Sequence, residues 1–316
     1  MSTVGIDVAK SKLDVAVRPS GERFSVSNDD AGLTLLVQKL KALAPPQRII
    51  LEPTGGYEAN LVRALLVAQL PVVVVNARQI RHFAQAVGRL AKTDALDADV
   101  IAQFGEAVQP QVRDIPDESR RELDALVTRR RQLMDMRAAE MKRKSTAPKR
   151  VHGSIDAVIA FLTKQIDDTD DDFRKLISST PAWREADDLL QSVPGVGRVL
   201  AATMLAMVPE LGKLTRKQIA ALIGVAPLAN DSGERRGRRT TWGGRAPVRA
   251  VLYMAALSAT RTPGPIKAAY ERLLQRGKPG KVAIVACMRK LLVVLNALLR
   301  DRRGWLPKLS EPSPCA

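Results

Sequence analysis

Three short apolar runs at the start of the chain restrict the folds that it can adopt. Apolar side chains alternate with other residues over residues 4–8, and the alternation returns over residues 13–17 and 24–26. The links between these runs are too short for a helical crossover, so the strands must pair with their neighbours in sequence. We therefore expect the chain to begin with an antiparallel, three-stranded meander.

Helices alternate with buried strands in the segments that follow this meander. Apolar spacing predicts a helix over residues 33–43, a buried strand over 49–51, a helix over 61–66 and a second buried strand over 71–75. A further helix starts near residue 93, and this order of elements matches a ribonuclease H-like α/β fold. In open α/β sheets, sites form at the carboxyl ends of the strands, so we expect Asp7 and Glu52 to converge with this last helix.

Residues 92–104 carry three acids at the start of that last helix, with Thr93 as the expected N-cap. The apolar stripe of the helix is formed by Leu96, Val100, Ile101 and Phe104. At about 100° per residue, Asp97 falls on the stripe, Asp94 lies at its edge, and Asp99 points the opposite way. Asp99 then only complements the helix dipole. An unpaired Asp97 carboxylate facing the core would be costly, and a bound cation would remove the cost.

Four acids are therefore candidates for one metal site: Asp7, Glu52, Asp94 and Asp97. Hard cations such as Mg²⁺, or Mn²⁺ in its place, prefer carboxylate oxygens. Such ions stabilise the charge that develops during phosphoryl transfer. The sequence predicts a catalytic, metal-binding role for these four residues.

Positive charge is concentrated in the last third of the chain. Residues 191–316 contain 22 basic and 6 acidic side chains, whereas residues 1–116 have a net charge of +1 and residues 117–190 a net charge of 0. Nearly all of the overall charge of +17 therefore lies in one region. This distribution is typical of a domain that binds nucleic acid.

The second half of the chain is expected to be helical. Residues 117–188 predict a helical hairpin, interpreted as a coiled coil, with a solvated acidic loop at residues 167–172. From residue 189 short loops join several helices, and the turn Leu190–Gly197 resembles a helix-hairpin-helix turn that contacts a phosphate. We expect residues 307–316 to be a disordered tail.

The segment 231–245 is too rich in glycine and arginine for a core. Its Ser232 is a candidate nucleophile for a phosphodiester, although local chemistry does not separate it from Thr240, Thr241 or Ser192. Guanidinium groups pair with phosphates, so we expect a set of arginines to contact nucleic acid. The set is Arg198, Arg235, Arg236, Arg238, Arg239, Arg245 and Arg249.

Little in the composition points to a membrane or to an oxidising compartment. Cys287 and Cys315 are far apart in sequence, and with two histidines they do not suggest a disulfide framework or a structural zinc site. No signal peptide and no apolar run of membrane-spanning length is apparent. We expect a cytoplasmic, nucleoid-associated bacterial protein with no membrane partner.

Several motifs occur in a fixed order along the chain: residues 5–10, 52–57 and 92–98, and a later series that comprises residues 224–227, Asp231-Ser232-Gly233, Val248-Arg249 and Leu252. Together they resemble the DEDD transposases of insertion-sequence family 110, which are bridge-RNA-guided DNA recombinases. The resemblance extends over nearly the whole chain, in the same motif order.

The resemblance implies three domains and a tail: a RuvC-like catalytic domain (1–116), a coiled-coil spacer (117–188), a mainly helical transposase domain (189–306) and the tail (307–316). It also implies that Ser232 is the nucleophile and that Asp7, Glu52, Asp94 and Asp97 form the family's acidic set. The implied partners are donor and target DNA, a structured noncoding RNA that specifies both, and further copies of the chain in a dimer or tetramer.

Three other interpretations stay open at this point. A RuvC-like junction resolvase or nuclease would use metal-activated water as the nucleophile, and Ser232 would then only bind. A sugar-kinase or actin-like ATPase also places an acid on its first strand, but it would need a second α/β half where this chain is helical and basic. A helix-hairpin-helix DNA-binding module would explain the charge but not Asp97.

Overall fold

The structure, a computed structural model, describes residues 2–43, 46–89, 94–112, 118–229, 231–232, 235–237 and 239–305. For residues 47, 94–96, 232, 235 and 236 it describes only the backbone. The chain divides into two units, Met1–Ile115 and Pro116–Ala316, and each is treated by itself below.

The first unit is built on a five-stranded mixed sheet with the order β3-β2-β1-β4-β5. β1 (Ser2–Val8), β2 (Lys12–Arg18) and β3 (Arg23–Ser27) form the antiparallel meander that the alternation predicted. β4 (Pro46–Leu51) pairs in parallel with β1, and β5 (Val72–Val74) pairs in parallel with β4. This is the ribonuclease H-like order expected from the sequence.

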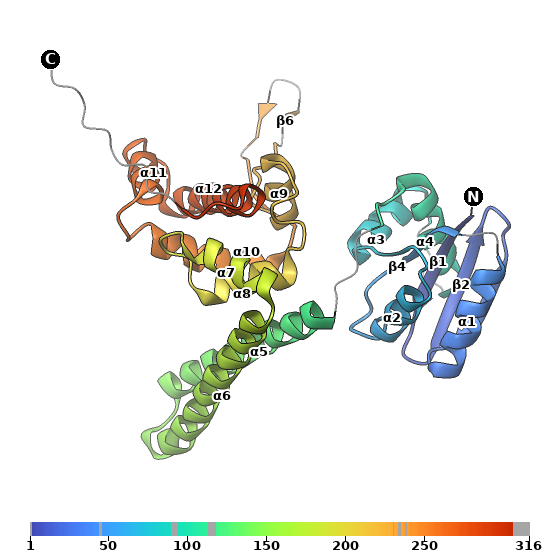
Figure 1. The fold of residues 1–316 in the computed structure, drawn as a ribbon, viewed down its shortest axis with the longest axis horizontal. Coiled ribbons are helices and arrows are strands. Elements are labelled where there is room, and N and C mark those ends of the chain that lie inside the picture. Colours follow the sequence, from blue (N-terminus) through green and yellow to red (C-terminus); the bar gives the residue numbers. More distant parts are fainter. Residues whose placement is uncertain are drawn as a thin grey trace. The chain divides into compact units, whose positions relative to one another are not determined.

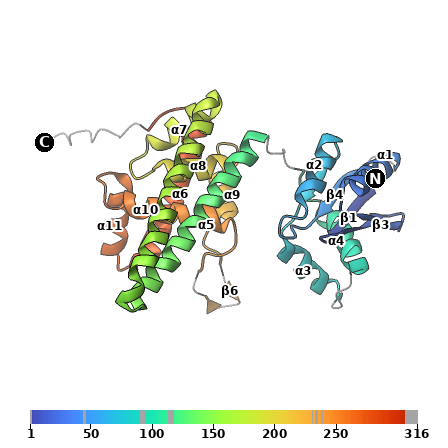
Figure 2. The same ribbon diagram turned by 90° about the horizontal axis from the view of Figure 1, so that it is seen from below.

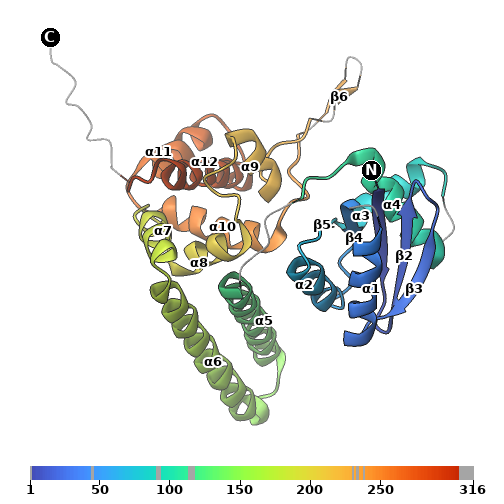
Figure 3. The same cartoon turned by 45° about the vertical axis from the view of Figure 1, so that its right-hand side comes forward.

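Helices cover both faces of this sheet, as Figures 1 and 3 show. α1 (Asp30–Ala42) and α2 (Ala59–Val67) bury leucine side chains against one face. On the other face, α3 (Ala77–Ala86) and α4 (Asp94–Val108) enclose a second apolar cluster that includes Ile50, Ile80 and Phe104. α3 is absent from the order of elements expected from the sequence.

α4 lies unusually close to β1 because both elements have small residues where they cross. A Cβ atom built on Gly5 would lie 2.9 Å from the Cα atom of Ala102, and closer still to the Ala98 carbonyl oxygen and the Ala102 nitrogen. Ala98 and Ala102 are both buried at this crossing. Only glycine allows this separation, so Gly5 sets the distance between the helix that begins with Asp94 and the strand that carries Asp7.

The second unit begins with a helical hairpin. α5 (Glu118–Thr146) and α6 (His152–Ser179), joined through a short 3₁₀ turn, η1 (Lys149–Val151), run side by side in Figures 1 and 2. Leu133, Leu162 and Ile166 pack between them. The acidic run 167–172, expected to be a loop, is instead helical: Ile166 and Phe173 on either side of it are buried, and Asp170 pairs with Arg130 of α5.

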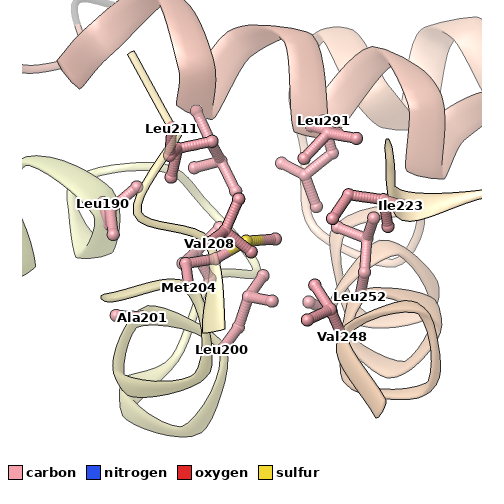
Figure 4. Close-up of a cluster of buried hydrophobic side chains, with 14 of the residues drawn as sticks. Leu190, Leu200, Ala201, Met204, Val208, Leu211, Ile223, Val248, Leu252 and Leu291 are labelled. Carbon is pink, nitrogen blue, oxygen red and sulfur yellow. The ribbon is translucent and has the colours of Figure 1, made fainter. Parts of the chain in front are cut away.

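Six further helices form the core of the second unit. They are α7 (Pro181–Gln191), α8 (Arg198–Met207), α9 (Arg216–Ile223), α10 (Ala246–Ala259), α11 (Pro265–Gln275) and α12 (Gly280–Asp301). Figure 4 shows how side chains from α7, α8, α9, α10 and α12 meet, among them Leu190, Met204, Ile223, Leu252 and Leu291.

α12 corrects the expectation that no apolar run reaches membrane-spanning length. Among the residues described, it is the one helix long and apolar enough to cross a membrane. Seven apolar side chains of α12, from Ala283 to Leu295, are nevertheless buried in the protein, including that of Cys287. Its apolar composition is therefore accounted for by its place in the core of the second unit.

Candidate active site

The sheet brings Asp7 and Glu52 to neighbouring positions. Ile6 of β1 is the pairing partner of Leu51 of β4, so the next residue on each parallel strand is an acid. Asp7 lies near the carboxyl end of β1, and Glu52 comes directly after β4. Sites in open sheets form at this end of the strands. Asp7 also lies two residues after Gly5, so it shares the face of β1 that α4 covers.

Asp97 of α4 joins Glu52 at a cavity of about 320 Å³. The cavity is lined by both carboxylates, by apolar residues of α3 and α4, and by Arg78, Arg81 and Arg89. Asp97 is half-buried at this cavity rather than enclosed in the core. Val100 and Ile101 of the apolar stripe line the same cavity, so Asp97 lies on the side of α4 that the periodicity predicted, and Glu52 lines the cavity with it.

The fourth acid, Asp94, lies at the start of α4, and its side chain is outside the described part of the structure. Thr93, the expected N-cap, is outside it as well. Among the described side chains, no group of three histidine, cysteine, aspartate or glutamate residues is close enough to hold a metal ion. The described acids fit a divalent cation by their chemistry, since carboxylate oxygens are the ligands that Mg²⁺ and Mn²⁺ prefer.

Asp99 is the clearest departure from the sequence interpretation. Helix periodicity placed it opposite the apolar stripe, where it would only complement the helix dipole, but it is 7% exposed and accepts a 2.7 Å hydrogen bond from Nη1 of Arg89. Arg18 and Arg23, from the edge of the meander, lie 3.5 and 3.6 Å away. Burial acts to raise the pKa of Asp99, but the three guanidinium groups outweigh it and hold that pKa below its usual value. Asp99 is a structural anion.

The arginine-rich segment forms a small arm on the second unit. β6 (Asp231–Ser232) pairs with β7 (Arg235–Arg236), and Leu228 bridges to Thr240 below them. Figures 1 and 3 show β6 standing away from the helices of this unit. Ser232 is paired through its backbone with Arg235, and Arg239 is exposed. Arg238 and the side chains of residues 232, 235 and 236 lie outside the described part of the structure.

The base of this arm is held by two arginines that the sequence suggested as nucleic-acid contacts. Arg245 donates two 2.7 Å hydrogen bonds to the carboxylate of Glu210 and one to the Met207 carbonyl. Arg249 donates to the carbonyls of Ile223 and Gly243. Both arginines therefore fix the arm to α8–α10. Their direct contact with nucleic acid stays a prediction.

Close backbone packing completes this anchor. Gly224 ends α9 with φ +79°, and a Cβ atom there would collide with the Gly243 carbonyl oxygen. The arm thus leaves and rejoins the helical body at one tightly packed point.

The turn between α7 and α8 presents Arg198 at a helix N-terminus. Gly197 is the N-cap of α8, and both residues line a groove of about 1060 Å³ with α5, α6 and α10. Ser192, one of the alternatives to Ser232, donates its hydroxyl to the Leu189 carbonyl and accepts a hydrogen bond from the Trp305 amide. Its hydroxyl is therefore engaged in hydrogen bonds that join the end of α7 to the segment at Trp305.

Comparison with known proteins decides the family. A DEDD transposase model of IS110 type, described as "Transposase", matches residues 4–147. A second model, "Transposase IS116/IS110/IS902 family", matches residues 187–271. The chain belongs to the IS110 family of transposases. The two matched regions of this transposase contain the four candidate acids and Ser232 respectively.

Sequence similarity to two relatives covers nearly the whole transposase. "Pilin gene-inverting protein" of Moraxella lacunata is 27% identical over 318 residues, covering 98% of both chains, and the protein of that name from Moraxella bovis is equally similar. "Insertion element IS116 uncharacterized 44.8 kDa protein" of Streptomyces clavuligerus is 30% identical over 46% of this chain and 36% of its own length. The transposase is therefore a DNA-recombining enzyme of a family that typically uses divalent metal ions.

Proposed function

We propose that this transposase is a site-specific recombinase of an insertion sequence, which cuts and rejoins DNA strands with an Mg²⁺- or Mn²⁺-binding acidic set and a serine nucleophile. The observation that carries the proposal is the placement of Asp7 and Glu52 at neighbouring strand ends, with Asp97 beside Glu52. Asp94 completes the acidic set by resemblance. The bound metal would supply electrostatic stabilisation of the phosphoryl-transfer transition state.

In this proposal the residues of the chain have separate tasks. Asp7, Glu52, Asp94 and Asp97 hold the cation at the phosphodiester. The Ser232 oxygen attacks the phosphorus and gives its proton to solvent water, while the ester oxygen of the DNA leaves with the electron pair of the broken bond and takes up a proton from water. Arginines on the arm stabilise the negative charge that develops on the phosphate. The link between protein and DNA keeps the phosphodiester energy, so strands can be rejoined without ATP.

Nucleic acid would be bound chiefly by the basic C-terminal region. We assign phosphate contacts to Arg198 and to the arm arginines Arg235, Arg236, Arg238 and Arg239, supported by the net charge of +16 in residues 191–316. The α7–α8 turn would act as the helix-hairpin-helix-like element, and the hairpin of α5 and α6 as the coiled-coil spacer. By family resemblance the guide is a structured noncoding RNA. The name of the two Moraxella relatives, which states that they invert a gene, supports recombination between specific sites.

The acidic set is tested by Asp97→Asn, with Asp30→Asn as a control at an exposed acid on α1. Asp97→Asn should lose strand cleavage, and Mn²⁺ should raise its melting temperature less than that of the wild type. Asp30→Asn should match the wild type in both assays. Recombination by Asp97→Asn at the wild-type rate would contradict the proposal.

The expected dimer or tetramer is tested by mixing two inactive variants. If acids and serine from different copies form one site, mixing Asp97→Asn with Ser232→Ala restores one complete site in each mixed pair. Strand cleavage should then reappear in the mixture. A mixture that stays inactive, although the two variants associate, would place both groups of one site on the same copy.

A further inference from the structure

The cavity beside the acidic set contains basic side chains that the reaction proposed above does not use. Arg78, Arg81 and Gln85 are spaced by three and four residues along α3, so they share one face of that helix, and all three line the cavity. Glu52 and Asp97 line it as well. Two arginines therefore stand beside the carboxylates that are assigned to the metal.

Arg78 and Arg81 have no ion-pair partner within the part of the chain that the structure describes. The third arginine at the cavity, Arg89, differs from them because Asp99 holds its guanidinium at 2.7 Å. The fold thus uses the charge of Arg89 but not the charges of the other two. Those two guanidinium groups can therefore bind an anion.

The position of the pair is also unfavourable for the helix itself. Arg78 lies in the first turn of α3, shortly after the N-cap Asn76, where the helix dipole disfavours a cation. Arg81 follows at the i+3 position, where like charges repel. Each effect costs a few tenths of a kcal/mol, and α3 has no acidic residue that would offset it. A bound anion would remove both costs.

We propose that Arg78 and Arg81 bind a backbone phosphate of the DNA strand that is cut, next to the phosphodiester held at the acidic set. Guanidinium groups bind phosphate oxygens in a bidentate manner, and two of them on one helix face fix the direction in which the strand runs. α3 is then the element that aligns the strand with Asp97 and Glu52. This inference rests on the proposed function, since it needs a DNA strand at the acids.

The test uses the full chain and a duplex that the wild type cuts, prepared as a series with one neutral methylphosphonate at each position near the cut. Arg81→Ala and Arg78→Ala are compared with Arg63→Ala, an exposed arginine of α2 outside the cavity. At one position, the methylphosphonate should lower the DNA affinity of the wild type and of Arg63→Ala. Arg81→Ala, which already lacks the contact, should bind the modified and the unmodified duplex with the same affinity. The slope of log affinity against log salt should fall by about one for each phosphate that the variant no longer neutralises.

Two results would overturn the inference. Arg81→Ala could retain the full methylphosphonate sensitivity of the wild type, in which case no phosphate is bound there. Alternatively, the substitutions could weaken binding of a structured RNA while leaving DNA binding unchanged, which would assign the site to RNA. Loss of the proposed function is read separately, from cleavage by Asp97→Asn, so the two failures are distinguishable.

Discussion

Substitution of Gly5 by alanine tests how the fold positions the acidic set. The added Cβ atom would lie 2.9 Å from the Ala102 Cα atom and closer to two backbone atoms of α4, whereas ordinary contacts are 3.4–4 Å. The Cβ position of alanine is fixed by its own backbone, and the atoms that it meets are backbone atoms as well, so no side-chain rotation relieves the contact. The helix must therefore move away from β1 by about 1 Å for the two 2.3 Å contacts to reach ordinary van der Waals distance.

The displacement should cost more in activity than in stability. Overpacking of this kind destabilises a protein by about 1–3 kcal/mol. A misplacement of about 1 Å at a reacting centre can lower the rate about 100-fold. Since α4 carries Asp94 and Asp97 while β1 carries Asp7, the shift separates members of the acidic set. We expect a folded variant whose strand-cleavage rate falls by about this factor.

The assay compares single-turnover DNA cleavage and thermal unfolding for Gly5→Ala and for Gly153→Ala. A Cβ atom at Gly153 of α6 would meet no atom within 4 Å, so this control makes the same chemical change in open space. The control should cleave at the wild-type rate and be equally or slightly more stable, since alanine favours a helix. Wild-type cleavage by Gly5→Ala, with an unchanged melting temperature, would refute the reasoning.

Other expected outcomes concern the buried Asp99, the half-buried Asp187 and the nucleic-acid partner. Asp99→Asn should lower the free energy of unfolding at pH 7 by about 1–3 kcal/mol, because it leaves three arginines around a neutral side chain. The pKa of Asp99 is lowered in the folded state, so its carboxylate stabilises the fold at neutral pH and loses this effect as pH falls through that pKa. The difference in free energy of unfolding between the wild type and Asp99→Asn should therefore disappear at low pH. Burial chiefly raises the pKa of Asp187, although the Gln191 hydrogen bond opposes it, so stability from this group is present at low pH and lost as pH rises through the raised value. Asp187→Asn should therefore raise the melting temperature at pH 7 more than at pH 4. Purified protein should retain RNA that is released at high salt, and disrupting the folding of that RNA at constant length should weaken binding.

The sequence predicted the sheet because its periodicity is local. The alternation in β1 and β2 predicts strands that bury one face, and the continuous apolar runs of β4 and β5 predict strands that are buried on both faces. The short links between the first strands leave only pairing with the neighbour in sequence, as observed. Asp7 and Glu52 could be predicted to converge for the same reason. α3 could not be placed as readily, because Ile80 is its one fully buried side chain. The cap Asn76 and the spacing of Ile80, Phe83 and Ala84 were the available signals.

The remaining differences come from contacts between distant segments. The periodicity of α4 alone gave Asp99 no role beyond complementing the helix dipole, but arginines from β2, β3 and the segment before α4 cover that side of the helix. Arg245 and Arg249 find partners 26–38 residues away in the chain, which no local pattern shows. Packing against distant segments also accounts for the helical acidic run of α6, since Ile166 and Phe173 on either side of it are buried in apolar clusters.

The central claim, a serine nucleophile served by the acidic set, is tested most directly by trapping the protein on DNA. Wild-type protein with Mg²⁺ and a cleavable duplex should form an adduct that survives denaturation, and peptide mapping should locate the DNA on Ser232. Ser232→Ala should bind the duplex with the wild-type salt dependence and form no adduct, whereas Ser192→Ala and Thr241→Ala should still form it. An adduct of undiminished yield from Ser232→Ala, or DNA cleavage by the wild type without any adduct, would contradict the account.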